Sequence, residues 1–92
     1  MLPIVWSKDA ELDLLEILEF VAERNPIAAL KLSNTLLECV IPLSEHPYIF
    51  KPSERFSGYR EIVAHPNYIV IYKVETHQIV VMQIVHSRQK FP

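Results

Sequence analysis

The sequence predicts a single α+β domain over residues 1–92, with an N-terminal strand and an antiparallel helical hairpin packed on a C-terminal antiparallel β-meander. The first half of the chain carries apolar residues at helical spacing, and the second half carries three β-rich runs. The breaks between these runs are two to four residues long, too short for the crossovers that parallel strands need. Half of the residues are hydrophobic and one is glycine, which is typical of a folded domain.

A short strand and a first helix are predicted at the N-terminus. Residues 2–6 are apolar and β-prone, and Ser7 is a good N-cap. From Lys8 to about Glu23, apolar positions step by three and four residues, as on one face of an amphipathic helix: Ala10, Leu14, Ile17 and Val21. Leu15, Leu18 and Ala22 widen that stripe.

A second helix is predicted from Pro26 to about Ile41, where Pro42 ends it. Asn25 is a strong N-cap, and proline at the first helical position loses no needed hydrogen bond. One apolar side of this helix comprises Ala29, Leu32, Leu36 and Val40. Because the connection between the helices is so short, they are expected to fold back as an antiparallel hairpin.

The second half predicts a connector followed by three strands. Residues 42–57 hold several prolines and aromatics, which predicts an ordered irregular loop. Gly58 is expected to mark a position where a side chain would clash. The strands are predicted at 58–65, 68–74 and 79–85. Both faces of the run 68–74 are largely apolar, so one face should take the hairpin and the other should be partly covered or meet a partner.

Charge and composition limit the classes of function. Residues 1–45 carry three cationic against eight acidic side chains, a net charge of −5, whereas residues 46–92 have a net charge of +3. This favours either an ordinary sheet or a mildly basic working surface, and the total of −2 is a poor basis for gripping RNA phosphates. The single Cys39 suggests a reduced, cytoplasmic protein. No signal peptide is predicted, nor an apolar run near the roughly 20 residues of a membrane span.

The C-terminal sequence His86-Ser87-Arg88-Gln89-Lys90 is the best candidate for chemistry. A histidine could act as a general base, and Arg or Lys could stabilise an oxyanion or a phosphorane. A solvated tail is the alternative that the residues leave open. Arg60 is either a salt-bridge partner or part of the same basic surface. The four histidines lack the spacing of a metal site, and no cofactor motif is present.

The order of elements and four short motifs resemble the ParE/RelE superfamily of toxins from bacterial type II toxin–antitoxin modules. These motifs are Leu43-Ser44-Glu45-His46-Pro47, Gly58-Tyr59-Arg60, Tyr68-Ile69-Val70-Ile71-Tyr72 and Val85-His86-Ser87-Arg88. The resemblance covers nearly the whole chain. It implies the α+β fold described above and one of two activities. RelE-like members cut messenger RNA at the ribosome without a metal, and ParE-like members poison DNA gyrase.

Two departures from the RelE pattern favour a ParE-like protein that is not an enzyme. Ile69 stands where RelE-like nucleases usually place an arginine, and Phe91 has no hydroxyl for acid or base chemistry. The resemblance then implies that the sheet presents together a target-binding surface of Arg60, His86, Arg88, Lys90 and Phe91. If the protein is a nuclease instead, His86, Arg88 and Lys90 are the candidate catalytic residues.

The resemblance also implies a partner and no cofactor. Such toxins are neutralised by a cognate antitoxin, often with a DNA-binding N-terminus and a disordered C-terminal segment that folds onto the toxin. An apolar sheet face and a helix groove fit such a segment. DNA gyrase is the implied target, with the ribosome and mRNA as the alternative. A third possibility is a toxin fold with another target, or a degenerate toxin that only binds its antitoxin.

Overall fold

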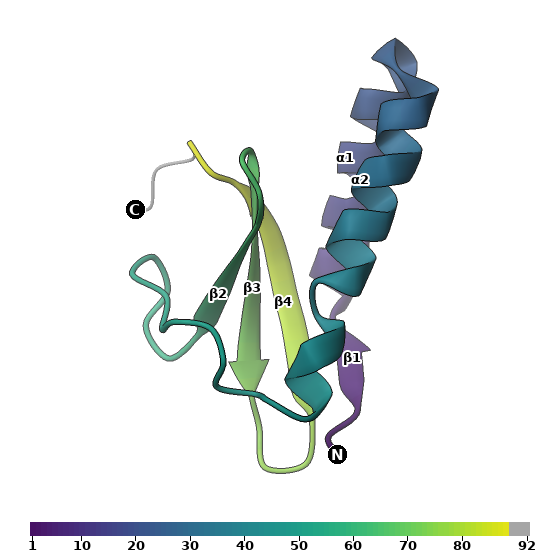
Figure 1. The fold of residues 1–92 in the computed structure, drawn as a ribbon. Helices are drawn as coiled ribbons and strands as arrows, with labels where there is room; N and C mark the ends of the chain where they lie inside the picture. Colours follow the sequence, from purple (N-terminus) through teal and green to yellow (C-terminus); the bar gives the residue numbers. More distant parts are fainter. Residues whose placement is uncertain (89–92) are drawn as a thin grey trace.

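The computed structural model describes residues 1–88 and contains two long helices against a four-stranded sheet (Figure 1). The elements are β1 (Ile4–Trp6), α1 (Lys8–Arg24), α2 (Pro26–Glu38), the 3-10 helix η1 (Ile41–Ser44), β2 (Arg60–His65), β3 (Tyr68–Val74) and β4 (Ile79–His86). The strand order is β1-β4-β3-β2. Strands β2, β3 and β4 form the predicted antiparallel meander, and β1 adds to β4 in parallel. The predicted α+β architecture is confirmed.

The helical hairpin turns at a single residue. Asn25 ends α1, because its backbone N–H donates to the Val21 carbonyl at 2.8 Å, and its side chain caps α2 by accepting from the Ala28 N–H at 3.0 Å. Ser7 caps α1 in the same way through the Ala10 N–H at 3.0 Å. Both caps agree with the sequence, since a side-chain oxygen satisfies one of the unpaired N–H groups in a first helical turn.

The second helix ends earlier than its sequence predicts. It stops at Glu38 rather than near Ile41, and Pro42 lies inside η1 instead of ending α2. Pro42 has no N–H to donate to the Glu38 carbonyl, so the α-helical ladder cannot continue. The next hydrogen bond is of the i→i+3 type, with the Leu43 N–H donating to the Val40 carbonyl.

The segment Pro26–Ser44 passes a test for a membrane-spanning helix by length and composition only. The core helix of a soluble protein passes the same test. Three α2 side chains of this segment, Ala29, Leu32 and Leu36, are buried in the fold.

Gly58 also differs from its prediction. A Cβ built at this position would meet nothing within 4 Å, so no clash requires glycine. The requirement is conformational, because the backbone has φ +87°, in the left-handed region that side chains disfavour. Gly58 lies in the connector, defined here as residues 45–59, and the strand that follows begins at Arg60.

The sheet has an apolar cluster on each face. The larger one joins the hairpin to the sheet and includes Ala10, Leu36, Val70 and Tyr72. On the other face Ile69, Ile71 and Val85 are buried, with Phe56 and Tyr59 of the connector packed against them. The expectation that the second apolar face is partly covered is therefore confirmed, and the covering segment is the aromatic connector.

A bulge in β4 decides which side chains face the helices. Ile71 of β3 pairs with Gln83 and Tyr72 pairs with Val81, which leaves Met82 as an extra residue. Val81 and Ile84 consequently both join the helix-side cluster. Helix α1 fixes this bulge, since the Ser7 hydroxyl donates to the Met82 carbonyl at 2.8 Å and the Asp13 carboxylate accepts from the Ile84 N–H at 2.9 Å.

Candidate functional site

Three aromatic side chains lie in a row across the end of the sheet where β2 turns into β3. Tyr68 pairs with His65 on one side and with His86 on the other. Its ring centroid is 5.6 Å from that of His65 and 5.5 Å from that of His86. We call this row, together with the exposed Arg88 beyond it, the tail end of the sheet. Sequence reasoning named His86 and Arg88 here but missed His65 and Tyr68, which depend on strand register.

Both histidines at the tail end hold a tight turn. The Nδ1 of His65 accepts the Asn67 backbone N–H at 3.0 Å, and the Nδ1 of His86 accepts the Arg88 backbone N–H at 3.1 Å. A neutral imidazole that accepts at Nδ1 carries its proton on Nε2. Each ring can therefore present an Nε2–H donor at the end of the sheet, while its other nitrogen orders the backbone.

Ser87 anchors the last described turn of the chain. Its backbone N–H donates to the Asn67 carbonyl at 2.8 Å, and its hydroxyl donates to the Pro66 carbonyl at 2.8 Å. The Ser87 carbonyl accepts from the Arg55 guanidinium at 3.1 Å. These three bonds tie the segment before Arg88 to the β2–β3 turn and to the connector.

The structure does not bring Arg60 next to His86. Arg60 pairs with Tyr72 on β3, and His86 pairs with Tyr68, four residues away along the same strand. At roughly 3.3 Å per residue, this separation is about 13 Å. Arg60 and His86 therefore do not touch, but a protein interface spans more than this distance, so a shared target-binding surface stays a prediction. Lys90 and Phe91 lie outside the described residues, and the part that all five play in target binding stays a prediction.

Arg60 supports the connector from the first position of β2. Its guanidinium Nη1 donates to the Phe50 carbonyl at 2.6 Å and its Cζ lies 4.8 Å from the centre of the Tyr48 ring. Among the described residues, no carboxylate oxygen lies within 4.0 Å of it, so the salt-bridge interpretation of Arg60 is not supported. It faces a pocket of about 430 Å³, the Arg60 pocket, lined by Tyr48, Ser53, Ser57, Gly58 and Tyr59 among others.

The neighbouring cations are engaged by Glu61, a residue that sequence reasoning did not single out. This carboxylate is only 5% exposed, and it lies 3.6 Å from Lys51 Nζ and 3.9 Å from Arg55 Nε. The Ser53 hydroxyl donates to it at 2.9 Å. A buried carboxylate needs such partners to offset the loss of hydration. Glu61 thus binds the connector to the sheet through Lys51, Ser53 and Arg55.

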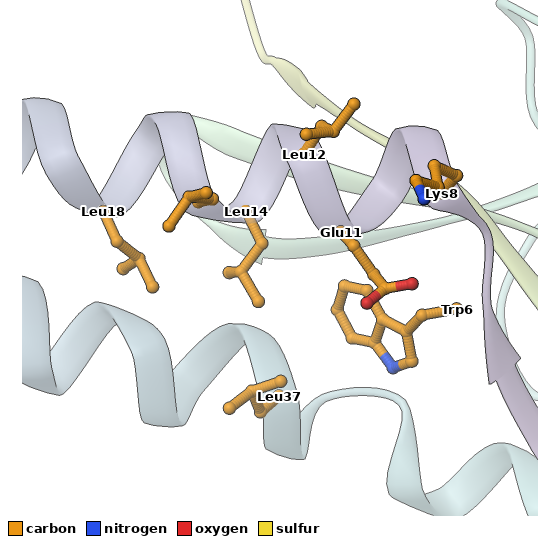
Figure 2. A pocket seen from close by; sticks show the side chains of 8 residues that line it. Trp6, Lys8, Glu11, Leu12, Leu14, Leu18 and Leu37 are labelled. Atoms are coloured by element: carbon orange, nitrogen blue, oxygen red, sulfur yellow. The ribbon is translucent and has the colours of Figure 1, made fainter.

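A second surface is the helical groove along the hairpin, shown in Figure 2. It has a volume of about 630 Å³ and is lined by Trp6, Lys8, Glu11, Leu12, Leu14, Leu15, Leu18 and Leu37. In Figure 2, Leu14 and Leu18 point from α1 toward α2, and Leu37 points back toward them. Leu15 is 54% exposed and Leu37 is 44% exposed. Leucines so exposed in one groove are typical of a surface that binds another protein.

Burial alters the acidity of two groups in the core. It raises the pKa of the Cys39 thiol from 9.0 to about 11, against the smaller opposing effect of a backbone hydrogen bond. It also raises the pKa of the Tyr72 hydroxyl, with the positive charge of Arg60 opposing the shift. Cys39 is therefore a thiol rather than a reactive thiolate near neutral pH. Within residues 1–88, no group of three or more His, Cys, Asp or Glu side chains could hold a metal ion.

Solved structures with the same fold include chains from toxin–antitoxin systems. A chain from the chromosomal ParDE system of P. aeruginosa is 24% identical, with a TM-score of 0.82 over 94% of this chain and 96% of that chain. A YafQ mutant from E. coli is 18% identical, with a TM-score of 0.63 over 95% and 94%. A chain of the RelBE2 complex from Mycobacterium tuberculosis is 17% identical, with a TM-score of 0.57 over 97% and 97%. No curated protein matches the sequence.

These similarities show that the chain shares the fold of these proteins. The sequence itself is more specific. Residues 4–91 match the family described as "ParE toxin of type II toxin-antitoxin system, parDE". The chain therefore belongs to the ParE toxin family, as the resemblance of its motifs implied.

Proposed function

We propose that this ParE-type toxin inhibits DNA gyrase by protein–protein contact in the cytoplasm, and that a cognate antitoxin neutralises it. The buried position of Ile69 is the observation that supports gyrase rather than mRNA as the target. This side chain is 4% exposed and packs with Ile71 and Val85, on the face covered by the connector. An arginine there would be buried among apolar groups rather than face a phosphodiester.

The charges of the sheet also favour a protein target. Lys51 and Arg55 are engaged by Glu61, and Arg60 lies at the opposite end of β3 from Arg88. Phosphate binding depends on several lysines and arginines that act together. The tail end, with His86 and Arg88 exposed, is instead a compact polar and aromatic surface suited to contact with gyrase.

The antitoxin is proposed to cover the helical groove. The groove is apolar at Leu14, Leu15, Leu18 and Leu37, and the hairpin from Lys8 to Glu38 carries three cationic against seven acidic side chains. A disordered segment with apolar and basic residues would bury the leucines and complement this charge as it folds onto the surface. Burial of such exposed side chains would favour binding and offset part of the cost of ordering the segment.

A supercoiling assay tests the proposed activity. Purified toxin is titrated into a gyrase reaction with relaxed plasmid, and the toxin bound to its antitoxin serves as the control. Inhibition with gyrase-linked DNA breaks by the free toxin alone is the expected result. No inhibition at high toxin excess would contradict the proposal.

An mRNA endonuclease is the second candidate, because His65 and His86 lie in one row beside Arg88. Two imidazoles near a cation could supply acid–base chemistry. A translating extract incubated with the same toxin decides between the two activities. Cleaved messages together with normal supercoiling would favour the nuclease. A toxin without effect in either assay would be a degenerate one or one with another target.

A further inference from the structure

We propose that the Arg60 pocket is a binding site for a peptide carboxylate, taken from an acidic side chain that a partner protein presents next to an apolar residue. The pocket has a volume of about 430 Å³ and includes the Gly58 backbone and the side chains of Ser57 and Tyr59. Arg60 is the one cation among its lining residues, and no carboxylate lines it. The pocket thus holds a positive charge that nothing within residues 1–88 neutralises.

The guanidinium of Arg60 has donors to spare for such a ligand. It carries five N–H donors, and one hydrogen bond from it, to the Phe50 carbonyl, is present among the described residues. That bond and the Tyr48 ring, 4.8 Å from Cζ, fix the plane of the guanidinium before any ligand arrives. A planar guanidinium held in place is well suited to two parallel bonds with a carboxylate.

The apolar neighbour of the carboxylate follows from a second hollow that shares Tyr48 with the pocket. This hollow is about 400 Å³ and is lined by His46, Pro47, Tyr48 and Ile49. Tyr48 is 65% exposed and Ile49 is 59% exposed, so both can be covered by an apolar side chain. A peptide with an apolar residue followed by a glutamate would fill the hollow and the pocket together.

The charge distribution favours a carboxylate over a nucleic-acid phosphate. Nucleic acids are held by several cations along the backbone, and the two nearest here, Lys51 and Arg55, are drawn to Glu61. A single cation in a partly enclosed polar pocket matches a single anionic side chain. The identity of the partner as the antitoxin or gyrase rests on the proposed function.

The test is a titration of the ¹⁵N-labelled full-length protein with acetyl-Leu-Glu-amide, followed by NMR. Gly58 is the only glycine of the chain and lines the pocket, so its amide signal is easily recognised. We expect saturable shifts of the Gly58 amide and the Arg60 side-chain N–H signals. Acetyl-Leu-Gln-amide should bind at least tenfold more weakly, and inorganic phosphate at the same concentration should leave these signals in place.

Variants at Ser57 test the pocket without disturbing the fold, because this residue is exposed and lines the pocket. Ser57→Glu places a carboxylate in the pocket and should weaken the Glu peptide at least tenfold, whereas Ser57→Gln should not. Arg60→Gln should abolish binding. Equal binding of the Glu and Gln peptides, unchanged binding by Ser57→Glu, or a preference for phosphate would overturn the proposal. The titration contains no gyrase, so its failure would leave gyrase inhibition standing.

Discussion

The carboxylate of Asp13 in α1 accepts a hydrogen bond from the backbone N–H of Ile84 at 2.9 Å, across 71 residues of sequence. This N–H lies just beyond the bulge in β4, where the ladder with β3 shifts register. Strand β1 pairs with β4 only as far as Val81, so within residues 1–88 Ile84 has no strand partner on that edge of the sheet. Helix α1 therefore supplies by a side chain what the sheet cannot supply there.

Loss of this bond should destabilise the protein. Asp13→Ala leaves the Ile84 N–H without its partner, and we expect a loss of about 1.5 to 3 kcal/mol of unfolding free energy. Urea denaturation followed by circular dichroism measures it. Glu19→Ala, an exposed position on the same helix, is the matched control and should change stability by less than about 0.5 kcal/mol. Equal effects of the two substitutions would refute this role of Asp13.

Cys39 should make the protein less stable in alkali. Its pKa in the fold is about 11, above the 9.0 of an unperturbed thiol, so the folded state holds a proton that the unfolded state releases first. This contribution is fully present below pH 9 and is lost as the pH rises toward 11. Urea denaturation of the wild type and of Cys39→Ala at pH values from 8 to 11 gives the unfolding free energy of each. We expect the two free energies to converge or cross as the pH increases. A constant difference between the two unfolding free energies across this pH range would show that the thiol does not titrate in this way.

The helical groove predicts a specific defect in antitoxin binding. Leu15→Glu places a charge among the leucines of the groove and should weaken antitoxin affinity at least tenfold, measured by calorimetry with the purified antitoxin. Leu30→Glu is the control, because Leu30 is also exposed on the hairpin, at 66% against 54% for Leu15, but does not line the groove. Similar affinities for the two variants would mean that the antitoxin docks elsewhere.

The sequence predicted those features that depend on local chemistry. Serine and asparagine are common N-cap residues, and Ser7 and Asn25 cap the two helices as their types predict. The spacing of apolar residues after each cap identifies the helix face that packs in the core. The strands of the meander likewise follow from short breaks between β-prone runs. These features need no knowledge of distant contacts.

Features that depend on distant contacts were not predictable in the same way. The three residues of β1 carry no signal for a parallel partner, which only the packing of α1 and β4 provides. The bulge at Met82 reverses the alternation of β4, and no turn residue marks it. Strand register also separates Arg60 from His86, although both belong to motifs that the resemblance joined in one surface.

Gyrase inhibition that depends on the tail end is the central claim, and a supercoiling assay with two variants tests it most directly. Arg88→Ala removes an exposed cation from the tail end, and Lys73→Ala removes one from β3 away from it. We expect Arg88→Ala to require at least tenfold more toxin for half-inhibition, and Lys73→Ala to match the wild type. Wild-type toxin that leaves supercoiling untouched, or two variants that inhibit equally, would contradict the account.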